Sequence, residues 1–202
     1  MQDQSDYEVE LVIVIGKECR DITPEQAADY IIGVSRLSIS GTMFSLTICS
    51  PQYTICNDVS ARKRMFATSQ WGMGKTFDGW LPLGPCLLSS AVLPIEHAQS
   101  LNLQAHLATS RSLHSAHKNP LQNGSTADQL WKIAETVSSL SYGTTLRVGD
   151  IICTGTPAGQ GSSKEPQLWL EHGDEITVSG EGIGSLRNTV QWEQPGSGKA
   201  RL

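Results

Sequence analysis

The stretch Tyr7-Glu-Val-Glu-Leu-Val-Ile-Val-Ile-Gly16 places two carboxylates in a run of β-branched and aliphatic residues. Residues i and i+2 of a strand project from the same face, so Glu8 and Glu10 stand side by side on a segment otherwise typical of a buried strand. Neighbouring anions repel unless a cation or proton lies between them, and a hard divalent ion with oxygen ligands meets that need. The alternative is an edge strand with a solvated charged face, which is more common for an isolated pair.

Length and composition limit the classes of protein. The 202 residues fit one domain, and a net charge of −5 argues against a nucleic-acid partner. The sequence contains no apolar run of about 18 residues, so we expect no membrane span. The polar start is unlike a leader, which predicts a cytoplasmic protein, or a mitochondrial one if an upstream leader is missing. Five cysteines without Cys-x-x-Cys spacing favour reduced thiols.

Strand patterns dominate the chain, and 19 glycines and 9 prolines imply many turns. We expect strands at 7–16, 53–59, 82–89, 101–107, 173–178 and 183–190, and a turn followed by a strand at 146–154. The order of these elements predicts a mainly β (α+β) domain with a few short helices.

Two helices are predicted. Thr23-Pro-Glu-Gln26 combines an N-cap with proline at the first helical position, and this helix is expected to end at Gly33. The second helix is expected to begin with Ser125 or Thr126 as its cap and to end at Gly143. Its predicted apolar stripe consists of Leu130, Ile133, Ala134 and Val137.

Further polar residues stand where predicted strands end. Asp58 would add a third carboxylate to the glutamate pair, which suits Mg²⁺ or Mn²⁺. Arg62 has the fork geometry to clamp a substrate carboxylate, and Lys75, on a glycine-flanked loop, could donate to a developing enolate oxygen. The turn at Thr156 offers hydroxyl and amide groups to an anion. Each residue alone has an ordinary alternative as a turn residue or a solvated charge.

Seven segments form a recognisable set of motifs. They are Tyr7 to Lys17, Asn57-Asp-Val-Ser-Ala-Arg62, Gly74-Lys-Thr-Phe-Asp78, Pro82-Leu-Gly-Pro85, Asn123-Gly-Ser-Thr-Ala-Asp128, Gly149-Asp-Ile-Ile-Cys-Thr-Gly-Thr-Pro-Ala-Gly159 and Gly182-Ile-Gly-Ser-Leu-Arg-Asn188. In this order they resemble the fumarylacetoacetate hydrolase family, most closely the type that is similar to oxaloacetate tautomerases. The resemblance runs from about Asp6 to Trp192.

The resemblance implies a mixed β-sandwich roll, a homodimer and Mg²⁺ or Mn²⁺ held by three carboxylates. By motif these are Glu8, Glu10 and Asp58, with Lys75 as a catalytic lysine and Thr156 as a substrate-binding group. The implied substrates are small 2-oxo or 1,3-dicarbonyl acids, and the leading expectation is an oxaloacetate keto–enol tautomerase. A C–C bond hydrolase or decarboxylase is the second reading, and an inactive fragment or dimer partner is the third.

The sequence departs from the family pattern in three places. The family's N-terminal lid with a His–Glu pair is not found before Glu8, so we expect residues 1–193 to form the catalytic domain without it. Met65 stands where the family often has glutamine. Residues 34–52 separate two segments that the family joins directly, and we expect a translated intron, because valine codons begin with GT and one glutamine codon ends in AG, or a genuine insertion. Residues 194–202 are expected to form a disordered tail.

Overall fold

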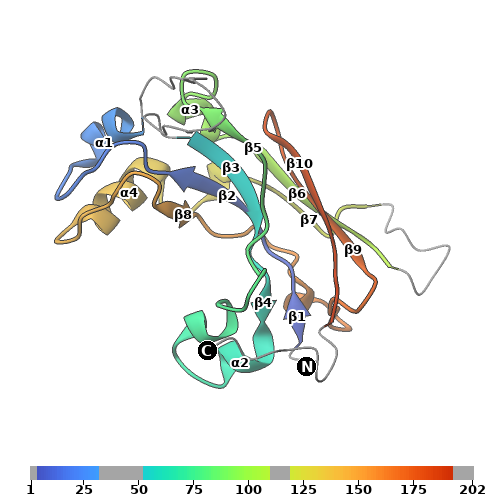
Figure 1. Ribbon diagram of the computed structural model, residues 1–202. Helices are drawn as coiled ribbons and strands as arrows, with labels where there is room; N and C mark the ends of the chain where they lie inside the picture. Colours follow the sequence, from blue (N-terminus) through green and yellow to red (C-terminus); the bar gives the residue numbers. More distant parts are fainter. Residues whose placement is uncertain (1–3, 32–51, 110–118, 193–202) are drawn as a thin grey trace, which may run out of the picture.

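The computed structural model describes residues 4–31, 52–109 and 119–192 (Figure 1). All pairings between its strands are antiparallel. One four-stranded sheet has the order β5 (Leu83–Ser89), β3 (Gln52–Asn57), β2 (Val9–Val14) and β8 (Ile151–Cys153). The other has the order β10 (Gly184–Thr189), β9 (Glu175–Gly180), β6 (Asn102–Ala108) and β7 (Gln122–Ser125). A small third sheet joins β1 (Ser5–Asp6) to β4 (Ser60–Ala61).

The helices are short and lie outside the sheets. They are α1 (Pro24–Tyr30), α2 (Arg62–Phe66), α3 (Ile95–Ala98) and α4 (Ile133–Ser141), with 3₁₀ turns η1 (Trp71–Gly74), η2 (Thr126–Asp128) and η3 (Gly161–Ser163). In Figure 1, α1 and α4 pack against each other at one end of the β5-β3-β2-β8 sheet. Among the described residues, no helix is long and apolar enough to cross a membrane. The predicted mainly β fold with few short helices is confirmed.

Strand β2 is hydrogen-bonded on both sides and buried on both faces. Its core face consists of Val9, Leu11 and Ile13, which pack into the main hydrophobic cluster between the two large sheets. Its site face consists of Glu8, just before the strand, Glu10, Val12 and Val14. The alternation predicted from the sequence therefore holds, and the strand lies inside the sheet and not at its edge.

The start of the first helix is also as predicted. Pro24 is the first residue of α1, and the Thr23 amide donates to Gln26 Oε1 at 2.9 Å, which is one half of a capping box. The predicted strands all appear, with boundaries that differ by a few residues.

The predicted start of the second helix is wrong. Residues 122–128 form β7 and η2, and α4 begins only at Ile133, so Leu130 is 85% exposed instead of lining an apolar stripe. Gln129 is not helical, with φ −57° and ψ 131°, and its side chain bonds to distant residues: Nε2 donates to Thr154 Oγ1 at 2.8 Å, and Oε1 accepts from Gln99 at 2.8 Å. These tertiary bonds hold the chain out of a helix that local propensity favours.

Several predictions concern residues outside the described ranges. They include the tail at 194–202 and most of the segment 34–52, of which only Gln52, the first residue of β3, is described. The domain boundary at 193 likewise stays a prediction.

Candidate functional site

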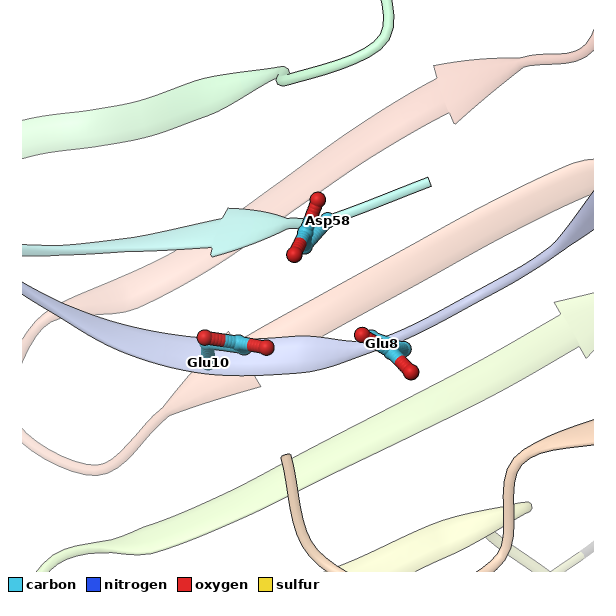
Figure 2. Close-up of side chains that lie close together, drawn as sticks. All are labelled: Glu8, Glu10 and Asp58. Carbon is cyan, nitrogen blue, oxygen red and sulfur yellow. The ribbon is translucent and has the colours of Figure 1, made fainter. Parts of the chain in front are cut away.

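Glu8, Glu10 and Asp58 meet where β2 and β3 run together (Figure 2). Asp58 directly follows β3, and its amide donates to the Glu8 carbonyl oxygen at 2.8 Å, which places the two residues opposite each other. One carboxylate oxygen from each of the three residues lies within 4.8 Å of those of the other two. Both glutamates are buried, and Asp58 is half-buried. The structure thus brings together the carboxylates that the sequence singled out; their role as metal ligands stays a prediction.

Lys75 lies against this acidic cluster. It follows η1, and its Nζ donates to Glu8 Oε2 at 2.7 Å and to Asp58 Oδ2. Burial alone would lower the pKa of Lys75, but the hydrogen bonds to Asp58 and Glu8 outweigh it and raise that pKa. In this arrangement Lys75 is therefore a protonated ammonium held between two carboxylates.

Arg62 is buried at the first turn of α2, and its guanidinium donates hydrogen bonds to two buried carboxylates of the same chain. Its Nη2 donates to Glu8 Oε1 at 2.5 Å, and its Nε donates to Asp6 Oδ2 at 2.8 Å. The remaining Nη1 lies 3.9 Å from the sulfur of Met65, the residue at the position where the sequence departs from the family. The predicted role of Arg62 in clamping a substrate carboxylate stays a prediction, and here the side chain orients Glu8.

Asp6 is a member of the site that the sequence interpretation missed. It is fully buried and accepts the amides of Gly161 at 2.7 Å and Ser162 at 2.9 Å in addition to Arg62. It therefore ties the start of η3 to the arginine that holds Glu8. The signal was present, because Asp6, Glu8 and Glu10 continue one alternation at i, i+2 and i+4.

The charges of this cluster do not cancel. Four carboxylates (Asp6, Glu8, Glu10 and Asp58) face two cations (Arg62 and Lys75), which leaves two negative charges when all are ionised. The pKa of Glu10 is raised to about 7, first by burial and then by the charges of Asp58 and Glu8, against the lowering effect of Lys75 and of the Gly155 amide, which donates to Glu10 at 2.8 Å. An all-oxygen donor set with this excess negative charge fits a hard divalent cation such as Mg²⁺ or Mn²⁺.

Thr156 lies beside the cluster, on the loop after β8. Its hydroxyl donates to the Val9 carbonyl oxygen at 2.9 Å and accepts from Gln122 Nε2 at 2.7 Å. Gln122 is fully buried, and its Oε1 accepts the Val9 amide at 3.0 Å. Gln122 thus fixes Thr156 against β2, a positioning role that the sequence did not signal. The predicted contact of Thr156 with substrate stays a prediction.

The fold and the acidic cluster describe a β-rich domain with a carboxylate site that fits a divalent metal ion. A family model described as "Fumarylacetoacetate (FAA) hydrolase C-terminal" matches residues 1–38 and 52–191. The chain therefore belongs to the fumarylacetoacetate hydrolase family, as the motifs indicated. Residues 39–51, which the match leaves out, lie inside the segment 34–52 that the sequence marks as off-pattern.

Curated relatives include hydrolases and tautomerases. A caffeoylpyruvate hydrolase of Neonothopanus nambi is 38% identical over 194 residues, which are 96% of this chain and 51% of that protein. The oxaloacetate tautomerase YisK of Bacillus subtilis is 34% identical over 187 residues, 93% of this chain and 52% of that protein. The chain thus spans about half the length of these relatives.

A solved structure supports the fold. A fumarylacetoacetate hydrolase from psychrophilic Exiguobacterium antarcticum superposes with a TM-score of 0.76 at 34% identity, covering 94% of this chain and 57% of that one. The two curated relatives are named for the keto acids caffeoylpyruvate and oxaloacetate, and this chain shares the family fold and carries an acidic cluster that fits a divalent ion.

Proposed function

We propose that this chain is a Mg²⁺- or Mn²⁺-dependent enzyme that acts on a small 2-oxo acid, as an oxaloacetate keto–enol tautomerase. The observation that carries this proposal is the buried cluster of Glu8, Glu10 and Asp58 with the Lys75 ammonium against it. A divalent ion in this cluster would supply a Lewis acid and a template for the oxygens of a 2-oxo acid. The similarity to an oxaloacetate tautomerase supports the choice of reaction.

Tautomerisation moves one proton between C3 and the oxygen on C2. Lys75 and Arg62 both donate to the carboxylate cluster, and of the two only Lys75 can give up its proton, since a guanidinium stays protonated. The pKa of Lys75 is raised because it donates to Glu8 and Asp58. A divalent ion held by Glu8 and Asp58 would neutralise their charges and so weaken the interaction that raises the pKa of Lys75. Lys75 would then give up its proton more readily and be suited to exchange it with substrate.

The activity is tested by following the ultraviolet absorbance of enol-oxaloacetate with and without Mg²⁺ or Mn²⁺. We expect metal-dependent decay above the spontaneous rate, abolished in Lys75→Met and retained in Lys17→Met, which removes an exposed lysine outside the site. Decay at the spontaneous rate in the metal-loaded wild-type chain would reject the proposed reaction.

Metal binding is tested separately by thermal denaturation. An ion that binds only the folded chain, at about 100 times its dissociation constant, adds roughly 2.7 kcal/mol to the free energy of unfolding. We expect this gain in the wild type and its loss in Glu10→Ala. An equal gain in both proteins would place the ion elsewhere.

The runner-up is a C–C bond hydrolase or decarboxylase of acylpyruvate-like or oxaloacetate-like acids, favoured by the similarity to a caffeoylpyruvate hydrolase. The three reactions leave different products: a pyruvate with a second acid, carbon dioxide, or an unchanged carbon skeleton. Product analysis by NMR on the metal-loaded chain separates them. Cleavage faster than tautomerisation would favour the runner-up.

We also propose that the chain forms a homodimer, on family resemblance alone. Light scattering of the purified chain measures this directly, and a monomeric mass at all concentrations would reject it. The rival to all catalytic readings is an inactive fragment or a partner for a longer paralogue. It predicts metal binding without turnover of any of these acids.

A further inference from the structure

The loop that follows β8 is attached to β2 at three successive residues. The Thr154 hydroxyl donates to the Leu11 carbonyl oxygen at 2.9 Å, and the Gly155 amide donates to Glu10 Oε2 at 2.8 Å. The Thr156 hydroxyl donates to the carbonyl oxygen of the residue on the other side of Glu10. The two threonines therefore hold Gly155 between them, and Gly155 presents a backbone amide to a carboxylate of the acidic cluster.

The Thr154 hydroxyl has a second partner in Gln129, which lies between η2 and α4. Gln129 Nε2 donates to Thr154 Oγ1 at 2.8 Å, and Gln129 Oε1 accepts from Gln99 Nε2 at 2.8 Å. Gln99 Oε1 in turn accepts the amide of Ile133, the first residue of α4, at 2.8 Å. A continuous chain of hydrogen bonds thus runs from the start of α4, through two half-buried glutamine side chains, to the loop beside the site.

Backbone groups at both ends fix the direction of this chain. The amide of Ile133 can only donate, so Gln99 presents its oxygen to that amide and its nitrogen to Gln129. Gln129 then accepts on its oxygen and donates from its nitrogen to Thr154. The single hydroxyl proton of Thr154 is left for the Leu11 carbonyl oxygen, which can only accept. Gln129 therefore determines which way the Thr154 hydroxyl points.

We propose that Gln129 is a positioning residue for the carboxylate cluster, because through Thr154 it holds the Gly155 amide on Glu10. Gly155 has a φ of +96°, which glycine adopts without steric cost. Since glycine is equally free to adopt other conformations, the anchors on either side decide where its amide points. Removing an outer partner of a metal ligand typically lowers metal affinity about 10–100-fold. This effect on ion binding rests on the proposed function, whereas the support of the loop does not.

The support of the loop is tested on the metal-free chain by hydrogen exchange, read for single amides by NMR. In Gln129→Met, the Gly155 amide should exchange about tenfold faster, the effect of losing roughly one hydrogen bond, while the amides of β2 keep their rates. The control is Gln26→Met, which removes a glutamine that accepts a hydrogen bond at 2.9 Å at the start of α1. Equal Gly155 exchange in Gln129→Met and the wild type would overturn the proposal, and so would an acceleration shared by the amides of β2.

Two variants of Thr154 test the same link and decide the proposal if Gln129→Met does not fold. Thr154→Val keeps the shape of the side chain without its hydroxyl, and it should accelerate Gly155 exchange as Gln129→Met does. Thr154→Ser keeps the hydroxyl and should exchange like the wild type. The double variant with Gln129→Met and Thr154→Val should exchange no faster than the faster single variant, since both remove one link. Equal rates in Thr154→Ser and Thr154→Val would overturn the role of the hydroxyl.

The consequence for the ion is tested by Mn²⁺ binding, followed by electron paramagnetic resonance. Gln129 acts through Thr154 and Gly155, so we expect a loss at the lower end of the range for outer partners, about tenfold in Gln129→Met, and unchanged affinity in Gln26→Met and Thr154→Ser. Equal Mn²⁺ affinity in Gln129→Met and the wild type would overturn the role towards the ion. A wild type that binds no Mn²⁺ would reject the proposed function, while Gly155 exchange would still decide whether Gln129 holds the loop.

Discussion

On the core face of β2, Val9, Leu11 and Ile13 pack into the main hydrophobic cluster, whereas on the site face Glu8 and Glu10 are equally buried among charges. Burial has opposite consequences on the two faces: it stabilises the apolar side chains, and it raises the free energy of carboxylates that remain ionised. The apolar contacts on the core face therefore stabilise β2, and β2 in turn holds Glu8 and Glu10 in their buried positions. The core face stabilises the fold, and the site face carries a concentration of negative charge that fits a divalent cation.

The largest effect is expected from Arg62→Met, which leaves Asp6 and Glu8 buried without their partner. Breaking a buried ion pair on one side costs about 3–5 kcal/mol, which urea unfolding at neutral pH measures. The control is Arg187→Met, since Arg187 pairs with Glu175 at the surface with its side chain 69% exposed, and such pairs contribute below about 1 kcal/mol. Similar losses of unfolding free energy in both variants would show that the ion pairs of Arg62 with Asp6 and Glu8 do not stabilise the site face.

Leu11→Ala tests the core face. Leu11 is fully buried, and truncation of such a side chain costs about 2–5 kcal/mol through lost burial and a cavity. Val12→Ala, on the site face one residue away, removes less apolar volume from a smaller cluster and should cost less. If Val12→Ala destabilises the chain more than Leu11→Ala in urea unfolding, the inference that the core face contributes most of the stability is wrong.

The pH dependence of the metal-free chain sharpens the comparison. Glu10 has its pKa raised from 4.5 to about 7, so its contribution to stability is fully present below about pH 4.5 and is lost as the pH rises through about 7. The difference between these two pKa values corresponds to about 3 kcal/mol in the free energy of unfolding. Relative to Glu10→Gln, the wild type should therefore lose stability between pH 5 and pH 8. Parallel pH profiles for the two proteins in urea would contradict this.

The smallest effect is expected from deleting residues 34–52. Gln52 Oε1 is buried and has no hydrogen-bond partner among the described residues, and an unsatisfied buried acceptor costs about 1–3 kcal/mol. Joining Gly33 to Tyr53 removes that atom and shortens the connection between α1 and β3, so we expect a gain of about 1 kcal/mol in unfolding free energy. A deletion variant that no longer melts cooperatively would show that the segment is integral to the fold.

The sequence predicted the features of the structure that depend on residues close to one another along the chain. The alternation around Glu8 and Glu10, the capping at Thr23 and the acid at Asp58 are local patterns, and each has its counterpart in the structure. The start of α4 was mispredicted, because Gln129 bonds to Thr154 and Gln99, 25 and 30 positions away. Bonds between distant residues leave no local pattern.

The same limit applies to the inner contacts of the site. The sequence indicated that Arg62 belongs to the site but not that its donors turn towards Asp6 and Glu8, more than 50 positions earlier. The support of Thr156 by Gln122 depends on the loop after β8 crossing β7, which no spacing in the sequence encodes. Charge and periodicity predict which residues lie in the site, and tertiary hydrogen bonds determine the orientation and the partners of their side chains.

The central position of β2 has a consequence for how the site moves. Its amides are bonded to β3 on one side and to β8 on the other, so they exchange with deuterated solvent only when a large part of the sheet opens. Lys75 and Thr156 are carried by loops instead. The position of Glu10 is thus tied to the stability of the whole sheet, while the backbone that carries Lys75 and Thr156 lies outside it. Changes in those loops can therefore move Lys75 or Thr156 while the strand that carries Glu10 keeps its hydrogen bonds.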